Sequence, residues 1–283
     1  MTTDPQTAAG GDAPVGTGSP FTRVLGILCL VGIAALLAFG LVWSAPDVVQ
    51  GDSVRIMYLH VPVAIVAFLA FAVTAFGSVM YLWRKSQFWD LTAGASAEIG
   101  VMFTALTLLT GMLWGRPTWG VFWVWDARLT TTALLLVLFL GYLAVRRIPG
   151  DPDVVAKRAA IAGLIAFIDV PIVHYSTVWW RTLHQGPTIT RLDPQIDGLM
   201  LFSLMLGMVV FLGVYLWLLV HRFRVAYLES QVDDLGLDVA LAERRAEGSA
   251  LPTSPTSPTS PTSPTLSSSP PEAAPLVTTG DER

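Results

Sequence analysis

Six long apolar runs constrain the fold of this chain more than any other feature. They cover residues at about 24–43, 62–83, 93–114, 129–145, 159–180 and 199–220. A helix rises about 1.5 Å per residue, so about 20 residues cross the hydrocarbon core of a bilayer; the fourth run is only marginally long enough. The runs are continuously apolar rather than alternating, which favours helices over a barrel. We therefore predict an all-α integral membrane protein with six transmembrane helices.

The composition agrees with this class of protein. Of 283 residues, 53% are hydrophobic and only 13% are charged, and the mean hydropathy is +0.59. The first apolar run exceeds the core of a signal peptide, which is about 7–15 residues long, so we predict that this helix is retained. The single cysteine, Cys29, excludes an intramolecular disulfide and a CxxC motif. The absence of a GxxxxGK[ST] motif excludes ATP hydrolysis by a P-loop.

Three parts are expected along the chain. Residues 1–23 form a disordered cytoplasmic N-terminus, and residues 24–222 form the membrane domain. Residues 223–283 form a cytoplasmic tail that starts with a short surface helix. From about residue 250 the tail is rich in Pro, Ser and Thr and is expected to be disordered, because it cannot build a core.

Basic residues predict the orientation in the membrane. One side of the predicted bundle collects Arg23, Arg84, Lys85, Arg146, Arg147, Lys157, Arg158, Arg222 and Arg224. The other side holds Arg55, Arg116, Arg128, Arg181 and Arg191. Cytoplasmic loops carry the excess of Lys and Arg, so both termini are expected in the cytoplasm. The outward loops are then at about 44–61, 115–128 and 181–198.

The segment WGRPTWGVFWVWDARLT, residues 114–130, concentrates aromatic residues in one outward loop. Its tryptophans are Trp114, Trp119, Trp123 and Trp125. Aromatic belts at both membrane interfaces explain single tryptophans, but not four in one short connection. If residues 117–126 are helical, Trp119, Phe122 and Trp123 share a face with Asp126, which predicts an amphipathic element lying in the interface.

Three other residues of this segment have predicted structural roles. Asp126 is a candidate N-cap of the fourth span, a role that is compatible with a place on the tryptophan face. Gly115 and Gly120 would let a flat ligand or another backbone approach closely.

Two histidines are expected at the same membrane level as the tryptophan segment. His60 lies in YLHVP. Pro62 suits the first turn of a helix and disfavours helical geometry at Val61, so we predict His60 in a surface turn. His184 lies in WWRTLHQGPT, where Gly186 and Pro187 are expected to end the fifth helix and leave the imidazole in an outward turn. The alternative is that each histidine is a capping or interfacial residue.

A large planar ligand with a charged edge fits these residues. Haem needs axial imidazoles, apolar walls and a cationic or polar exit for its propionates. His60 and His184 could supply the axial ligands, and Trp119, Trp123 and Trp125 the wall. Arg55 and Arg128 could form charge-assisted bonds with the propionates, although snorkelling to the interface would equally explain these arginines.

Three motifs resemble a known family. The tryptophan segment resembles the WWD signature of the haem-handling proteins of cytochrome c maturation. Its DARLT ending, together with LHVPVA and WWRTLHQGPT, resembles the system I member, the haem exporter protein C (CcmC) family. The similarity covers roughly residues 24–222 in motif order and span count.

The resemblance implies a haem-delivery protein of the bacterial cytoplasmic membrane rather than an enzyme. It implies that haem b is held as cargo by an external segment, with His60 and His184 as axial ligands. The matching haem-binding positions are Trp114, Gly115, Trp119, Gly120, Trp123, Trp125, Asp126, Arg128 and Arg55. It implies handover to the periplasmic haem chaperone CcmE, which captures haem covalently. It also implies a complex with the ABC transporter subunits CcmA and CcmB and the small protein CcmD.

Departures from the family pattern and alternatives remain open. Arg181 and Val178 differ from the residues typical of the family beside the His184 turn. A cytochrome c synthetase also carries a WWD signature, but it would need a second, intramembrane histidine pair, and only His174 lies clearly within a span. A membrane b-type cytochrome and an ordinary small-molecule transporter are further alternatives.

Three ionisable residues within or near the spans have no assigned role. They are Glu98, Asp169 and His174. Such residues are costly in a membrane and are often functional. Glu98 is close enough to the cytoplasmic end to be interfacial. Asp169 and His174 flank Pro171, and we expect them to bond backbone groups freed by a kink there.

Overall fold

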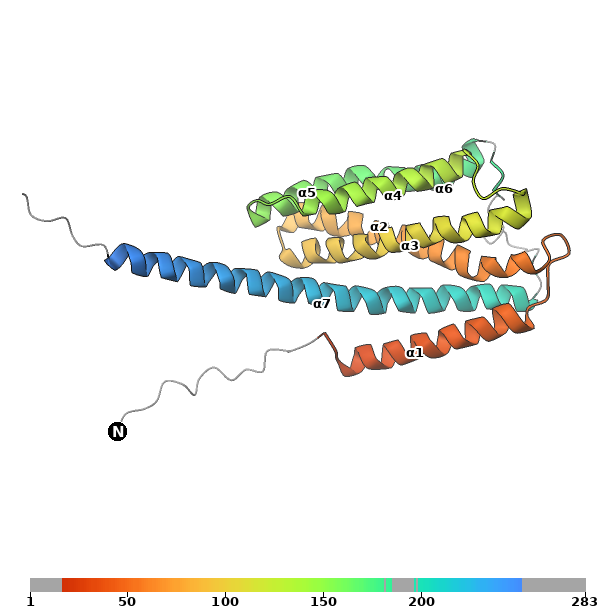
Figure 1. Cartoon of the computed structure of the whole chain (residues 1–283), viewed down its shortest axis with the longest axis horizontal. Coiled ribbons are helices and arrows are strands. Elements are labelled where there is room, and N and C mark those ends of the chain that lie inside the picture. The colour runs from red at the N-terminus through yellow and green to blue at the C-terminus, as the bar shows by residue number, and fades with distance from the viewer. Residues whose placement is uncertain (1–16, 181, 185–195, 197, 251–283) are drawn as a thin grey trace, which may run out of the picture. The chain divides into compact units, whose positions relative to one another are not determined.

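The computed structural model describes residues 17–180, 182–184, 196 and 198–250, with side chains to residue 245. Its helices are α1 (Pro20–Leu37), α2 (Met57–Arg84), α3 (Gln87–Trp119), α4 (Ala127–Arg146), α5 (Pro152–Phe167), α6 (Asp169–Trp179) and α7 (Gly198–Ala250). A π-helical turn, η2 (Ala38–Trp43), continues α1, and a 3₁₀ helix, η3 (Asp52–Ile56), leads into α2. The described residues contain no strand (Figure 1).

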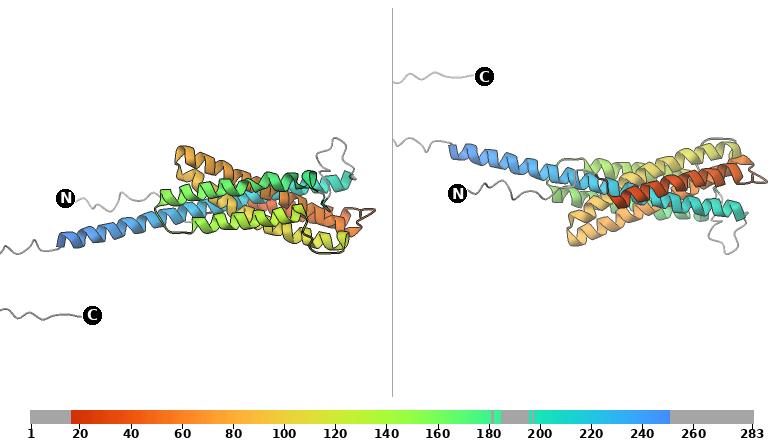
Figure 2. Two further views of the ribbon diagram at one scale, coloured as in Figure 1. Left: turned by 90° about the horizontal axis from the view of Figure 1, so that it is seen from above. Right: turned by 90° about the horizontal axis from the view of Figure 1, so that it is seen from below.

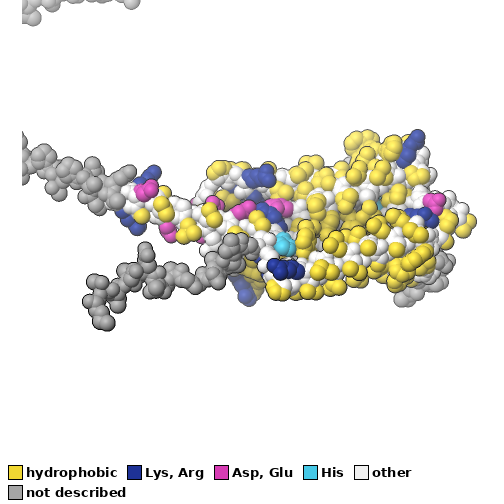
Figure 3. All heavy atoms as spheres, turned by 60° about the horizontal axis from the view of Figure 1, so that its bottom comes forward, with side chains coloured by type: hydrophobic (Ala, Val, Ile, Leu, Met, Phe, Trp, Pro, Cys, Tyr) yellow, Lys and Arg dark blue, Asp and Glu magenta, His cyan; other side chains and the backbone are white. Residues whose placement is uncertain are grey.

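The predicted fold class is confirmed. Six helical segments are long and apolar enough to cross a membrane, one of them formed by α5 and α6 together. Large apolar side chains such as Ile27, Leu30, Val137 and Val209 are exposed on these segments. Figure 3 shows hydrophobic side chains across this face of the helices and charged side chains gathered toward its two ends. Such a surface is unfavourable in water and matches the hydrocarbon core of a bilayer.

The helices alternate in direction, which gives the bundle two chemically different ends (Figure 1). The tryptophan end contains the start of α2, the end of α3, the start of α4 and the end of α6. The basic end contains the end of α2, the start of α3, the end of α4 and the start of α5. Most described Lys and Arg side chains of the bundle belong to the basic end, which holds Arg23, Arg84, Lys85, Arg146, Arg147, Lys157, Arg158, Arg222 and Arg224.

The start of α2 differs from the prediction. The helix begins at Met57 and runs through Pro62, so His60 lies within the helix and not in a surface turn. Because Pro62 has no N–H, it cannot bond the carbonyl of Tyr58, one turn earlier. That carbonyl faces Gly207 of α7, where a Cβ atom would lie 2.7 Å from it. The backbone of α7 therefore packs closely against α2 at the carbonyl that Pro62 leaves without its helical hydrogen bond.

The fifth span is broken near its middle. α5 and α6 meet at Ile168, three positions before Pro171, so the predicted irregularity is present. α6 then ends at Trp179, before Gly186 and Pro187, which therefore do not end this helix as predicted. Among the described residues, the Asp169 side chain has no hydrogen-bond partner, and its Oδ2 is buried. The predicted hydrogen bond between Asp169 and backbone groups freed by the kink is therefore not found.

Helices α1 and α7 lie side by side (Figure 2). Trp217 donates from Nε1 to the carbonyl of Thr22 at 3.0 Å. Gly32 faces Val210, and Gly213 faces Cys29, so small residues let the two helices approach closely. This packing buries Cys29, the one cysteine of the chain.

The tail after residue 220 does not begin with a separate surface helix, because these residues continue α7. The chain divides into two compact units, residues 1–234 and residues 235–283, and the described part of the second unit is the end of α7. Residues 1–16 of the predicted disordered lead and the predicted Pro/Ser/Thr tract fall outside the described residues. The predicted bound at residue 23 is wrong, because residues 20–23 form the first turn of α1, capped by Ser19. Most of the predicted loop at 181–198, including Arg181, also lies outside the described residues.

Candidate functional site

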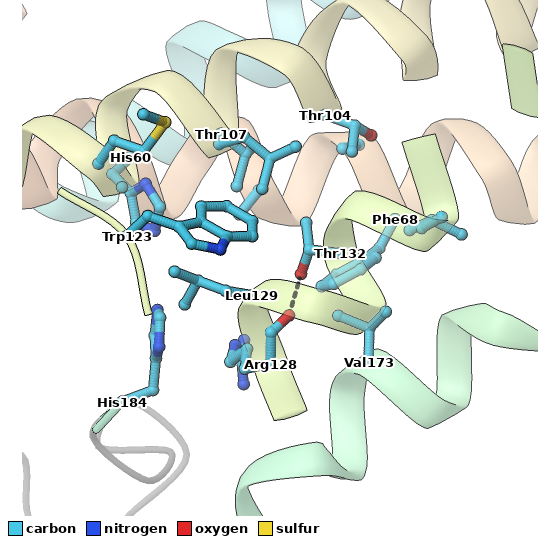
Figure 4. Close-up of a pocket in the computed structure, with 16 residues that line it drawn as sticks. His60, Phe68, Thr104, Thr107, Trp123, Arg128, Leu129, Thr132, Val173 and His184 are labelled. Carbon is cyan, nitrogen blue, oxygen red and sulfur yellow. Dashed lines mark hydrogen bonds between the residues drawn. The ribbon is translucent and has the colours of Figure 1, made fainter. Parts of the chain in front are cut away.

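One cavity joins the two predicted histidine ligands. Its walls come from α2, α3, α4 and α6, and the region between them spans about 580 Å³, which includes open solvent at its mouth. The lining residues are His60, Ala64, Ala67, Phe68, Thr104, Thr107, Leu108, Gly111, Met112, Trp123, Arg128, Leu129, Thr132, Leu135, Val173 and His184. His60 and His184 lie at one end of the cavity, and Phe68 and Val173 lie toward the other (Figure 4).

His60 is held against α3. Its Nδ1 lies 2.9 Å from the hydroxyl oxygen of Thr110, a side chain that is only 4% exposed. The edge of its ring faces Gly111, where a Cβ atom would come within 3.1 Å of the imidazole Cε1. The ring also contacts Trp114 edge-on, with 5.7 Å between ring centroids. Three contacts from neighbouring positions of α3 thus restrain where this imidazole can point.

His184 reaches the same cavity from the connection after α6. Its ring contacts Trp119 edge-on, with 5.0 Å between centroids. Its Nδ1 is buried and lies 3.7 Å from Oδ2 of Asp126, which is too long for a hydrogen bond. Burial and the nearby Arg128 guanidinium lower the pKa of His184 to about 4. The imidazole is therefore neutral at neutral pH, as a metal ligand must be.

The tryptophan segment does not form the predicted interfacial helix. α3 extends to Trp119, and Gly120 ends it in a left-handed conformation with φ of +80°. Residues 121–126 are bends and irregular backbone before α4 begins at Ala127. A glycine in this conformation stops a helix, and the predicted face of Trp119, Phe122 and Trp123 is therefore split.

The four tryptophans of the segment take different places. Trp114 contacts His60 and Trp119 contacts His184, as described above. Trp123 lines the cavity, and its Nε1 is buried with no hydrogen-bond partner among the described residues. Trp125 packs edge-on against Trp123 and is 82% exposed. Each imidazole thus has one tryptophan beside it, and a third tryptophan forms part of the cavity wall.

The two predicted propionate partners are not equivalent. Arg128 lies in the first turn of α4 and lines the cavity. Arg55 does not line it; its Nη2 donates to the carbonyl of Ser44 at 3.1 Å and lies 3.3 Å from Oδ1 of Asp52. The structure therefore brings Arg128, but not Arg55, to the histidines.

Asp126 connects the tryptophan segment with α4 and with His184. Its Oδ1 accepts from the backbone N–H of Leu129 at 2.7 Å, which confirms the predicted N-cap. Its Oδ2 accepts from the backbone N–H of Leu183 at 3.3 Å and faces His184. One carboxylate thus caps a helix and holds the connection that carries the second histidine.

The predicted glycines have structural explanations. At Gly115, a Cβ atom would lie 3.1 Å from the ring of Trp119 and 3.4 Å from the carbonyl of Val121. Gly120 is required by its positive φ. Neither glycine lines the cavity.

Three residues of the site were missed from the sequence. Thr110 and Gly111 contact the imidazole of His60 and hold it against α3. The side-chain oxygen of Gln50 accepts a hydrogen bond from Nε1 of Trp114 at 2.9 Å. Threonine and glycine inside an apolar run read as ordinary packing residues. The one available signal was the three-residue spacing of Gly111 and Trp114, which places both on one face of a helix. Both residues contact His60 from that face.

The three unassigned ionisable residues lie away from this cavity. Glu98 pairs with Arg222 of α7, whose Nη2 lies 2.9 Å from Oε1 of Glu98. Asp169 is 4% exposed at the break between α5 and α6. His174 is exposed on α6, and its ring contacts Tyr175 edge-on. The intramembrane histidine is thus not part of the described cavity.

Comparison with known proteins identifies the family. The profile of the family described as CcmC, heme exporter protein C, matches residues 14–237. Heme exporter protein C of Haemophilus influenzae is 42% identical over 204 residues, which cover 71% of this chain and 82% of that protein. The protein of the same name from Bradyrhizobium diazoefficiens is 38% identical over 204 residues, covering 71% of this chain and 78% of that protein.

A mitochondrial relative extends the comparison to plants. A putative cytochrome c biosynthesis ccmC-like mitochondrial protein of Arabidopsis thaliana is 36% identical over 211 residues, which cover 73% of this chain and 79% of that protein. The matched family profile covers all six candidate membrane spans as far as residue 237. With three motifs, the span count and these identities in agreement, the chain belongs to the haem exporter protein C (CcmC) family.

Proposed function

We propose that this protein binds haem as cargo between His60 and His184 and presents it for cytochrome c maturation. The observation that carries the proposal is that an imidazole from α2 and an imidazole from the connection after α6 line one cavity, together with Arg128 and Trp123. Haem proteins use imidazole ligands, an apolar pocket and polar or cationic groups near the propionates. The names of the relatives, haem exporter protein C, support a role in haem handling.

Each residue has a part in holding the cargo. His60, on α2, offers a ligand from a rigid helix, and His184 offers one from the connection after α6. Trp114 and Trp119 restrain these rings, and Trp123 gives the porphyrin an aromatic wall. Arg128 is the nearest candidate partner for a propionate. For Arg55 to serve as a second partner, its guanidinium would have to leave Ser44 and Asp52.

The proposed binding is suited to release. Dispersion and hydrophobic burial hold a porphyrin without directional bonds, and axial ligands can be exchanged by a competing partner. We therefore propose delivery without bond-making catalysis by this chain. The proposed recipient is the haem chaperone CcmE, and the proposed cargo is haem b.

The proposed setting is the bacterial cytoplasmic membrane, with the tryptophan end outside and both termini in the cytoplasm. The excess of Lys and Arg at the basic end supports this orientation. We further propose assembly with the ABC transporter subunits CcmA and CcmB and with CcmD, since this chain carries no P-loop of its own.

The test is the absorption spectrum of the detergent-purified full chain, compared with His60→Ala and His184→Ala. We expect a low-spin bis-histidine spectrum in the wild type and its loss or conversion in both variants. His174→Ala is the matched control, because this histidine lies outside the cavity. An unchanged spectrum in both cavity variants, lost instead in His174→Ala, would favour a membrane b-type cytochrome or a synthetase-like intramembrane site.

A further inference from the structure

We propose that Thr110 sets the tautomer of His60, so that Nδ1 carries the proton and the Nε2 lone pair is left for haem iron. The proposal rests on the function proposed above. It makes Thr110 a positioning residue, because its hydroxyl acts on the cargo only through the imidazole.

Two short contacts meet at the Thr110 hydroxyl. Its Oγ1 lies 2.9 Å from Nδ1 of His60 and 2.8 Å from the carbonyl oxygen of Leu106, one turn earlier on α3. A second carbonyl, that of Thr107, lies 3.2 Å away. The side chain of Thr110 is 4% exposed, so solvent has little access to these groups. The direction of each hydrogen bond must therefore be decided among the groups present.

Counting protons decides the direction. A hydroxyl has one hydrogen to donate, and a carbonyl oxygen can only accept. At 2.8 Å, the Oγ1 and the Leu106 carbonyl would repel one another unless the hydroxyl hydrogen lay between them. Oγ1 then offers a lone pair to His60, so Nδ1 must be the donor. In the opposite tautomer, Nδ1 would be the acceptor and the hydroxyl hydrogen would point toward it. Neither the Leu106 carbonyl nor the Thr107 carbonyl would then receive a hydrogen bond from Oγ1.

The free nitrogen is the one that a metal needs. The hydrogen bond from the imidazole of His60 to another side chain is made at Nδ1, and His60 lines the cavity. The backbone of Thr107, one turn before Gly111 on α3, also bonds this ring, and a carbonyl there favours a ring N–H on the α3 side. A ligating histidine commonly donates its other N–H to an outer group, which fixes both the tautomer and the ring orientation. Gly111, next to Thr110, leaves room for the ring edge. The contacts that orient His60 are therefore supplied by residues of this chain.

The second histidine lacks such a hydrogen bond. Nδ1 of His184 is buried without a hydrogen bond, and Asp126 is 3.7 Å away. The two proposed ligands thus differ: His60 is oriented by a hydroxyl, whereas the distance between His184 and its neighbouring carboxylate is longer than a hydrogen bond.

The experiment uses the full chain in lipid nanodiscs with ¹⁵N-labelled histidine. Nitrogen NMR of the haem-free protein distinguishes the protonated from the unprotonated ring nitrogen, and the His60 signals are those lost in His60→Gln. We expect the Nδ1–H form in the wild type and in Thr110→Ser, and a mixed or reversed form in Thr110→Val. Haem titration should show affinity reduced by about 10- to 100-fold in Thr110→Val, the range typical when an outer partner of a ligand is removed.

Thr131→Val is the matched control. Thr131 also donates to the carbonyl four residues earlier, that of Ala127 at 2.7 Å, but among the described residues its hydroxyl bonds backbone carbonyls and not a histidine. It should leave the tautomer and the affinity unchanged. An unaltered tautomer in Thr110→Val, or a Ser variant that behaves like Val, would overturn the proposal. Haem bound unchanged by His60→Gln would instead overturn the proposed function, and the haem-free spectra would still decide what Thr110 does.

Discussion

At the basic end of the bundle, charged side chains reach across helices to opposite charges, whereas at the tryptophan end Arg128 lines a cavity together with two histidines. Arg146 makes two contacts with Asp90, at 2.6 and 2.9 Å, and Arg222 pairs with Glu98. At the tryptophan end, the ring nitrogens of Trp123 and His184 are buried without partners among the described residues, and both side chains line the cavity. Buried polar groups are normally hydrogen-bonded. The other described exceptions, on Arg55, Arg158 and Asp169, lie outside the cavity, so the pair that lines it calls for an explanation. The difference suggests that one end fastens the helices and the other holds a ligand.

The two largest expected effects are a loss of stability at the basic end and a loss of haem binding at the tryptophan end, each without the other. Asp90→Ala should lower the free energy of unfolding by about 3 kcal/mol, because it leaves a mostly buried Arg146 without its counter-charge. Its affinity for haem should equal that of the wild type. His60→Ala should show the opposite pattern, with low-spin haem lost and a smaller change in stability. Denaturant unfolding of the haem-free protein and haem titration measure the two properties.

An exposed acid provides the control for the basic end. Asp233→Ala removes a carboxylate from an exposed position of α7 and should change neither property. A loss of haem affinity in Asp90→Ala as large as that in His60→Ala would show that the two ends are coupled, which would break the comparison.

A smaller effect is expected at Asp126, where both kinds of role meet. Asp126→Ala should lower stability by about 1 kcal/mol through loss of the N-cap. It should also lower haem affinity by about 10- to 100-fold, because His184 loses its carboxylate neighbour. Asp126→Ser keeps a capping oxygen and should retain stability while affinity still falls. If the Ser variant bound haem like the wild type, the carboxylate would have no part in holding His184.

The smallest effect concerns the space beside His60. Gly111→Ala should displace the imidazole by a few tenths of an ångström, since a Cβ atom would lie 3.1 Å from Cε1. We expect haem affinity to fall by less than about tenfold. Gly141→Ala on α4 is the matched control because its Cβ atom would meet nothing within 4 Å. It should raise stability by about 0.5–1 kcal/mol, as alanine does in a helix, and leave binding unchanged. Equal affinities in the two variants would count against the contacts described for His60.

Much of the fold could be predicted because it depends on local properties of the sequence. The apolar runs mark the six spans, and an acidic residue before an apolar run marks the cap at Asp126. The helix through Pro62 could not be predicted, because the freed Tyr58 carbonyl packs against Gly207, on the last helix of the bundle. Long-range compensation of this kind leaves no mark near the proline itself.

The site could be predicted in part, for a similar reason. His60, His184 and Arg128 meet in the cavity, and their place near the outer ends of their spans was readable. The helix considered for residues 117–126 does not form. The spacing of the aromatic residues favoured a helix there, but Gly120 ends α3 within this segment. The partners of His60 and Trp114 could not be found, since Thr110 and Gln50 gain their roles only through contacts between separate segments.

The lining of the cavity also has a consequence for the order of events during synthesis. Every described lining residue lies between His60 and His184, and α7 contributes none. Chains emerge from the ribosome N-terminal part first, and early segments can fold before later ones are made. The cavity can therefore be assembled from the earlier helices alone, and the last helix then packs against elements that already surround it.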